Sequence, residues 1–285
     1  MIDRAFTVDV EDWHHSNLAG MPATAGATSI LPQSMPLLLD LLAELNVRAS
    51  FFILADVLDE VKPFLPRLRA AGHEVASHGS HHRLAYEQTA DEFRADIAAA
   101  KQRIEDAWGE AIAGYRAPSW SIGPANKHYL QAIADAGYLY DASLLPFRTY
   151  LYGYPDAPRA PFQPRIDGRP LPLVEVPGTT ARLWGKVIPF AGGFYLRALP
   201  AALLKRLAAN AAAEGLPLIY YLHPREILVE QPRPAGLTAR ERLIHLHGLR
   251  GVAGKLRTIL QSGGFRPLGE LVAAWRETGL PAGDL

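Results

Sequence analysis

Short β-rich runs alternate with helical patterns along most of this chain, and the alternation restricts its fold more than any other feature. The β-rich runs occupy residues 4–10, 47–54, 73–77, 112–116, 138–143, 173–177 and 216–223. Apolar residues at helical spacing occupy 35–45, 61–71, 90–108, 125–136 and 199–215. Strands joined by helical crossovers form parallel sheets. About seven such units predict a single deformed (β/α) barrel of the α/β class, with a doubly wound open sheet as the alternative.

Two stretches lie outside this alternation. Residues 146–172 are dense in proline and aromatic residues and lack a helical period, so we expect a long excursion between two strands. Such an excursion either serves the function or covers a barrel edge as a surface loop. Residues 237–262 predict helices that pack outside the barrel. We therefore expect one domain over residues 1–285, with 237–285 as a C-terminal helical extension.

Composition excludes several classes of function. Lys+Arg and Asp+Glu both number 29, so the formal net charge is zero, which argues against nucleic acid as a partner. The chain has no cysteine, so any metal site must use histidine or carboxylate ligands. No stretch approaches the ~18 uninterrupted apolar residues of a transmembrane helix. No signal-peptide run precedes the first acidic residues either, so we expect a cytoplasmic protein.

Polar clusters follow four of the predicted strands, at the end where both candidate architectures bind ligands. They read DVED (9–12), SHGSHH (77–82), YRAP (115–118) and YLHP (221–224). His78 and His82 are four residues apart, which places two imidazoles on one face of a helical turn and rotates His81 away. An acidic residue of the first cluster can complete a divalent-metal site of two histidines and one carboxylate.

Two further polar residues stand at strand ends. Arg116 can hold a carboxylate in its ionised form and fix its orientation. His223 follows the apolar run LIYYL and is either a core histidine or, beside a metal site, a general acid. Trp13, Tyr115 and Trp120 adjoin the clusters and predict either apolar faces for sugar rings or core packing.

The ordered set of motifs resembles a known family. TVDVEDW, SHGSHH, YRAPSW, YDASL and YYLHP occur in the order found in the polysaccharide deacetylases (NodB homology, carbohydrate esterase family four). The resemblance covers roughly residues 4 to 224. The stretches AGGFYLRALP (191–200) and HPREILVEQPRP (223–234) look like the subgroup found in exopolysaccharide and PEP-CTERM/exosortase gene clusters. The resemblance implies a deformed (β/α) barrel that removes acetyl groups from an N-acetylated glycan with the help of a metal.

The resemblance also implies roles for individual residues. Asp9 matches the catalytic base, Arg116 the arginine that holds this base, and His223 the general acid. Leu222 matches the apolar residue that lines the acetyl pocket. Aromatic faces for the sugar are expected from Trp13, Tyr115 and Trp120.

The implied metal ligands include one ambiguity. His78 and His82 match the metal-binding histidines, and the metal is expected to be zinc, with cobalt, nickel or iron as alternatives. The Asp-Asp pair of the family reads Asp9-Val10-Glu11-Asp12 here, so Glu11 is the expected third ligand and Asp12 its rival. Gly79 also replaces the Ser or Thr that often follows the first histidine, and we expect a slightly less rigid turn.

Two other functions are compatible with these residues. An amidohydrolase acting on a small non-sugar amide could use the same groups. A carbohydrate-binding module without activity could use the same fold, although every expected catalytic position is filled.

Overall fold

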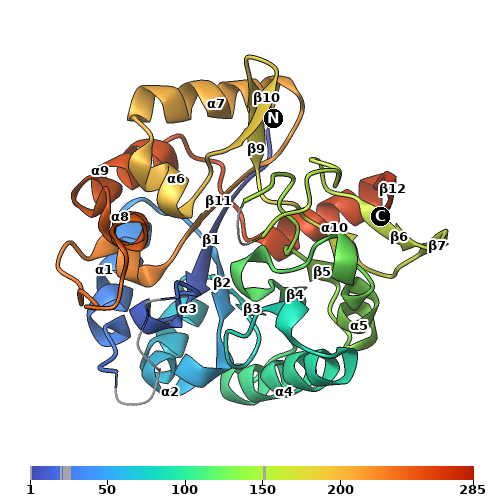
Figure 1. Cartoon of the computed structure of the whole chain (residues 1–285), viewed down its shortest axis with the longest axis horizontal. Coiled ribbons are helices and arrows are strands. Elements are labelled where there is room, and N and C mark those ends of the chain that lie inside the picture. Colours follow the sequence, from blue (N-terminus) through green and yellow to red (C-terminus); the bar gives the residue numbers. More distant parts are fainter. Residues whose placement is uncertain (1, 20, 22–26, 150–151) are drawn as a thin grey trace.

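The computed structural model describes residues 2–19, 21, 27–149 and 152–285. Its centre is a sheet of seven parallel strands in the order β11-β1-β2-β3-β4-β5-β8, which curls in Figure 1. Each strand lies within a predicted β-rich run, so the deformed (β/α) barrel is confirmed. The strands are β1 (Arg4–Val10), β2 (Ser50–Ile53), β3 (Glu74–Ser77), β4 (Gly114–Tyr115), β5 (Tyr140–Asp141), β8 (Val174–Glu175) and β11 (Leu218–Leu222).

The crossover helices lie on the outer side of this sheet (Figure 1). They are α1 (Leu31–Glu44), α2 (Leu58–Val61), α3 (Leu65–Ala70), α4 (Ala90–Trp108), α5 (Tyr129–Asp135) and α7 (Ala201–Ala213). The helix expected over 61–71 is interrupted by a 3₁₀ turn at Lys62–Phe64, because Pro63 and Pro66 each fit a first helical turn but not a helix interior. None of the described helices is long and apolar enough to cross a bilayer.

The two faces of the sheet bury different sets of side chains. On β2, Phe51 and Ile53 pack outward beneath the helices, whereas Phe52 points into the barrel. The inward cluster includes Ala5 of β1 and Leu268 of α10 (Leu268–Thr278), a helix close to β1. This part of the barrel interior is therefore apolar. The polar side chains of the candidate site lie at the carboxyl ends of the strands.

The 146–172 stretch is largely irregular but contains two short strands, β6 (Gln163–Ile166) and β7 (Arg169–Pro170). β6 pairs in parallel with β12 (Ala282–Asp284) near the C-terminus, a partner that local sequence cannot indicate. Phe147 and Thr149, in the earlier part of the stretch, line a cavity at the end of the barrel. Residues 150–151 lie outside the described part of the chain.

The C-terminal helices do more than cover the outside of the barrel. They are α8 (Ala239–Leu246) and α9 (Leu249–Leu260), followed by α10. Arg240, Leu243 and Ile244 of α8 line the same cavity as the polar strand ends. Residues 237–262 were expected to pack outside the barrel, and α8 in addition reaches the cavity, because the partly open barrel leaves α8 access to its rim.

The segment between β8 and β11 closes one side of this cavity. It contains the antiparallel pair β9 (Thr180–Leu183) and β10 (Lys186–Pro189), then α6 (Gly193–Ala198). Between them Gly192 bridges Tyr221 of β11. A Cβ on Gly192 would lie 2.3 Å from the carbonyl oxygen of Tyr221. Only glycine allows this close approach, which brings α6 onto the strand that carries the last motif.

Gly192→Ala is expected to lower the free energy of unfolding by about 1–3 kcal/mol, because the added methyl group must displace the backbone of β11. The matched control is Gly254→Ala in α9, where a Cβ meets nothing within 4 Å. That change should raise stability by about 0.5–1 kcal/mol, since alanine favours a helix over glycine. Urea unfolding of both variants measures the difference. Equal stabilities would contradict the tight approach at Gly192.

Candidate active site

The inward face of β1 carries the first carboxylates of the site. Phe6 and Val8 pack outward, so the alternation of side chains along a strand turns Thr7 and Asp9 inward. Glu11 follows the end of β1 and is only 3% exposed, and Asp9 is 1% exposed. The two carboxylates therefore share the carboxyl end of the strand.

Asp9 is held by an arginine from a strand that is distant in sequence. Arg116 follows β4, and its Nη1 lies 2.5 Å from Oδ1 of Asp9 and 3.0 Å from Oγ1 of Thr7. Its guanidinium also lies over the Phe52 ring, with 4.1 Å between Cζ and the ring centroid. Both members of the pair are buried, so the ion pair fixes the orientation of the Asp9 carboxylate.

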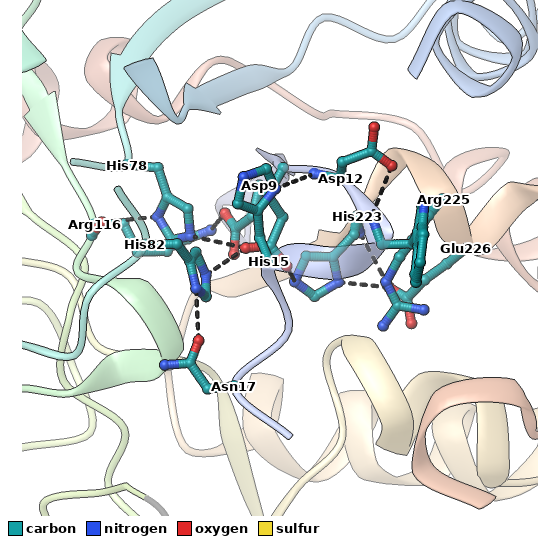
Figure 2. A network of polar contacts seen from close by, with 12 residues as sticks. Asp9, Asp12, His15, Asn17, His78, His82, Arg116, His223, Arg225 and Glu226 are labelled. Atoms are coloured by element: carbon teal, nitrogen blue, oxygen red, sulfur yellow. Dashed lines mark hydrogen bonds and ion pairs between the residues drawn. The ribbon is translucent and has the colours of Figure 1, made fainter. Parts of the chain in front are cut away.

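Glu11, His78 and His82 form one cluster. Figure 2 shows the two histidines of this cluster side by side. Oε2 of Glu11 contacts Nε2 of His82 and lies 3.8 Å from Nε2 of His78. One ligand atom from each of the three residues lies within 4.8 Å of the others. Among the described residues this is the one group of three or more acidic or histidine side chains that could hold a metal ion.

The second nitrogen of each histidine has a fixed partner (Figure 2). Nδ1 of His78 lies 2.8 Å from the carbonyl oxygen of Arg116, and Nδ1 of His82 lies 2.7 Å from Oδ1 of Asn17. Both partners accept, so each Nδ1 carries the proton and donates it. Each Nε2 then presents a lone pair toward Glu11. Partners of this kind typically orient metal-binding histidines.

The loop that brings the histidines together is not the expected helical turn. Residues 78–82 contain no helix, and both Gly79 (φ 82°) and His82 (φ 51°) occupy the left-handed region. A Cβ on Gly79 would also lie 3.1 Å from Oδ2 of Asp96, so the backbone favours glycine there. Ser80 steadies the loop instead, because its amide and hydroxyl both donate to Asp96. His81 is exposed, with its Nδ1 2.8 Å from Asp56.

Asp12 is buried but lies apart from the cluster. Its carboxylate accepts from the backbone amide of Trp13 at 2.7 Å and from that of Ile30 at 3.0 Å. It caps the 3₁₀ turn Trp13–His15, and in Figure 2 its carboxylate points away from His78 and His82. Its two oxygens therefore hold backbone, and Glu11 alone of the two rivals faces the histidines.

The cluster fits a divalent cation. Oε2 of Glu11 is buried and has no hydrogen-bond partner among the described residues. Burial lowers the pKa of His78 to about 4, so this imidazole is neutral at neutral pH, as a ligand must be. Burial raises the pKa of Glu11, but His82 and His223 outweigh it and hold that pKa well below its usual value. Two imidazoles and one carboxylate suit zinc and related metals.

His223 follows β11 and faces the cluster from the opposite side. Its Nε2 lies 3.5 Å from Oε1 of Glu11, and its Nδ1 lies 3.0 Å from Oε2 of Glu226. Arg197 of α6 holds Glu226 in turn, with 2.5 Å between Nε and Oε1. Burial lowers the pKa of His223, but Glu11 and Glu226 outweigh it and raise the pKa above its ordinary value. His223 therefore stays protonated to higher pH than a free histidine.

These groups open into a cavity of about 440 Å³. Its floor includes Asp9 and Glu11, and its walls come from distant segments. Trp120 lines it and packs edge to face against Tyr221, with ring centroids 4.4 Å apart. The cavity is large enough for a sugar residue, and it offers both flat apolar faces and charged groups.

Of the residues expected to bind substrate, Trp120 is at the cavity wall and the others are not among its lining residues. Trp13 is 7% exposed and donates its indole N–H to the carbonyl of Thr28. Tyr115 is 1% exposed and packs against other aromatic rings. Leu222 points outward into the core, because it lies between Tyr221 and His223, which face the cavity.

Comparison with known families identifies the N-terminal part of this fold. The family model for polysaccharide deacetylases matches residues 22–140, which include both histidines and Arg116. The chain carries a polysaccharide deacetylase domain. A second family model, a domain of unknown function called DUF3473, matches residues 142–273. That match is consistent with the exopolysaccharide-cluster subgroup of the deacetylases. None of the curated proteins compared with the chain matches it.

Solved structures share the fold of both matched parts of the chain. A protein from Mycobacterium smegmatis, assigned as a polysaccharide deacetylase, has a TM-score of 0.69 at 22% identity, over 99% of this chain and 93% of its own. One from Pseudomonas aeruginosa, assigned likewise, has a TM-score of 0.59 at 16% identity, over 97% and 91%. The Puue allantoinase also has a TM-score of 0.59, at 19% identity over 97% and 91%. At these identities the likeness extends to the fold alone.

Sequence reasoning missed several residues of this candidate site. Glu226 and Arg197 support His223, and Asn17 supports His82. The spacing of Glu226, three residues after a histidine that precedes proline, resembles a capping box and could have suggested the contact. Asn17 and Arg197 have no such local signal. Only the fold brings Asn17 to His82 and Arg197 to Glu226.

Proposed function

We propose that this chain is a metal-dependent hydrolase that removes N-acetyl groups from an N-acetylated sugar or exopolysaccharide. One observation carries the proposal: a buried oxygen of Glu11, which has no hydrogen-bond partner in the described part of the chain, faces two oriented imidazoles. The family match supports a deacetylase, and the cavity beside the cluster supports a sugar-sized substrate.

The metal would be held by His78, His82 and Glu11, with zinc as the expected ion and cobalt, nickel or iron as alternatives. When bound, such an ion activates water and polarises an amide carbonyl. Asp12 is left out of the proposed ligand set because backbone amides already occupy its carboxylate.

The chain's own residues would move the protons. Asp9 would accept the proton of the attacking water, and Arg116 keeps its carboxylate aimed at that position. His223 would donate a proton from Nε2 to the departing amine, since an amine is a poor leaving group unless protonated. Glu226 holds Nδ1 of His223, which leaves Nε2 directed toward Glu11 and the reacting centre.

We also propose that the chain works as one catalytic domain. The cavity is lined by Asp9, His78 and Trp120 from the N-terminal half, and by His223 and α8 from the C-terminal half. Neither half encloses the cavity without the other. Trp120 is the aromatic side chain we retain as a sugar-binding residue, because it lines this cavity.

The test is release of acetate from a panel of N-acetylated glycans, with defined metals added to metal-free protein. Wild-type protein should release acetate from at least one glycan. Asp9→Asn should lower turnover on the order of 10²–10⁴-fold, because the amide cannot accept the water's proton. Calorimetry on the same variant should show glycan binding retained.

Other outcomes would favour the alternatives. Glycan binding without acetate release by the wild-type protein would indicate a carbohydrate-binding module. The fold is also found in the Puue allantoinase, so a small cyclic amide belongs in the panel. Turnover of that amide without release of acetate from any glycan would indicate a small-amide hydrolase.

A further inference from the structure

Two arginine side chains line the cavity wall beside His223, and among the described residues only one of them forms an ion pair with a carboxylate. Arg197 and Arg225 both line the cavity and are 3% and 6% exposed. The carboxylate that forms an ion pair on this wall is Glu226, and its oxygens are directed to Arg197 and to His223. Glu226 therefore pairs with Arg197 and not with Arg225, which forms no ion pair among the described residues, and burying a cation without a partner is costly.

Arg197 is fully engaged by the protein. Besides Glu226, it donates to the carbonyl oxygens of Ile244 and His247 at the end of α8. These contacts tie α6 to α8 and hold Glu226 against His223. Arg197 is therefore part of the support of the proposed general acid and has little capacity left for a ligand.

Arg225 is not engaged in the same way. Its Nη1 lies 3.4 Å from Oε1 of Gln231 and 3.4 Å from the carbonyl oxygen of His245, both long for a charged donor. Its Nε is buried and has no hydrogen-bond partner among the described residues. A buried guanidinium at a cavity wall with an unused N–H can bind an oxygen anion that enters the cavity.

The rim of the cavity continues this positive character. Arg148 is exposed and is one of the residues that line the cavity. The acidic residues of the lining are already committed, because Asp9 pairs with Arg116 and Glu11 faces the histidines. Among the described residues, the buried cation of the lining that forms no ion pair is therefore Arg225, close to His223.

We infer that the substrate is an N-acetylated sugar that carries an anionic group, a carboxylate or a phosphate, and that Arg225 binds this group. Arg148 would attract the same anion as it enters the cavity. This inference rests on the proposed function, and it adds the substrate class. A neutral N-acetylated oligosaccharide would leave Arg225 unpaired and should therefore be a poorer substrate.

The experiment compares three probes of similar size: a neutral N-acetylhexosamine oligosaccharide, one containing N-acetylated hexosaminuronic acid, and an N-acetylhexosamine phosphate. The wild-type protein is expected to have kcat/KM about tenfold to a hundredfold higher on an anionic probe than on the neutral one. The uronic acid and the phosphate arms distinguish the two sources of the charge. Arg225→Gln should remove the preference by raising KM for the anionic probes to the level of KM for the neutral probe.

Two variants control for charge and folding. Arg206 is an exposed residue of α7 and is not among the cavity-lining residues. Arg206→Gln should therefore leave the preference intact. Arg148→Gln changes an exposed side chain and should reduce the preference even if Arg225→Gln fails to fold. Equal kcat/KM on all three probes overturns the inference, as does a preference that survives both Arg225→Gln and Arg148→Gln.

Binding separates this inference from the proposed function. Calorimetry with Asp9→Asn should show the anionic probe bound more tightly than the neutral one, by about the same factor as kcat/KM. Tighter anion binding by a protein that releases no acetate supports the role of Arg225 and refutes the deacetylase. Acetate release with equal binding of all probes retains the deacetylase and overturns the role of Arg225.

Discussion

Glu11→Gln is expected to remove the metal from the protein, whereas Asp12→Asn is expected to leave about one metal per chain. Glu11 faces both imidazoles with an oxygen that accepts no hydrogen bond from any residue the structure describes, so the neutral amide removes one charged ligand. Asp12 is occupied by the amides of Trp13 and Ile30, and asparagine still offers an oxygen to them. Loss of a ligand should exceed the roughly 10–100-fold fall in metal affinity typical of outer-shell partners.

The metal content of the two variants is measured after dialysis. The stability of each variant without metal serves as the control. Glu11→Gln should unfold at nearly the same denaturant concentration as the metal-free wild type, so that its metal loss cannot reflect misfolding. Similar, mild losses of metal in both variants would refute Glu11 as the single carboxylate ligand. A stoichiometric metal content in a His78→Ala/His82→Ala double variant would show that the site lies elsewhere.

His223→Ala is expected to keep its metal and lose turnover on the order of 10²–10⁴-fold. Nε2 of His223 lies 3.5 Å from Oε1 of Glu11, close enough to serve the same reacting centre without being needed as a ligand. Metal content and acetate release on the same preparation give both results. Loss of the metal would make His223 a ligand, and near-normal turnover would make it a core histidine.

The pH dependence of the rate gives a second test of the role of His223. Burial lowers the pKa of His223, but Glu11 and Glu226 outweigh it and raise the pKa above its ordinary value. A general acid works only when protonated, so the rate should fall as the pH rises through that raised pKa. His223→Ala should lack this alkaline limb. Glu226→Gln removes one cause of the raised pKa and should move the limb to lower pH.

The architecture was predictable because strand and helix periods are local properties of the chain. All seven strands of the curled sheet fall within the predicted runs, and α4 has the predicted bounds, which a capping box and a left-handed glycine define. The β6–β12 pairing was not predictable, because it joins short segments far apart in sequence. The same holds for α8 at the cavity, since its position depends on where the barrel stays open.

The chemical groups of the site were also readable from the sequence, as strand ends that carry unusual polar clusters. Parallel strands bring their carboxyl ends to one rim, so Asp9, His78, Arg116 and His223 were expected to be neighbours. The computed structural model places their side chains around one cavity or in contact with its lining. This part of the site depended only on the order of the strands and on residue type.

The sequence by itself thus determined the barrel, the set of polar residues at its rim and the absence of thiol ligands. Only the tertiary structure decided which of these groups meet. Asp12 and Glu11 are adjacent and chemically similar, but backbone amides capture one carboxylate and the histidines face the other. Leu222 was expected to line the acetyl pocket but packs in the core, whereas Arg225, for which no role was expected, lines the cavity. The direction of a side chain depends on backbone torsion and on partners distant in sequence, which residue type alone does not encode.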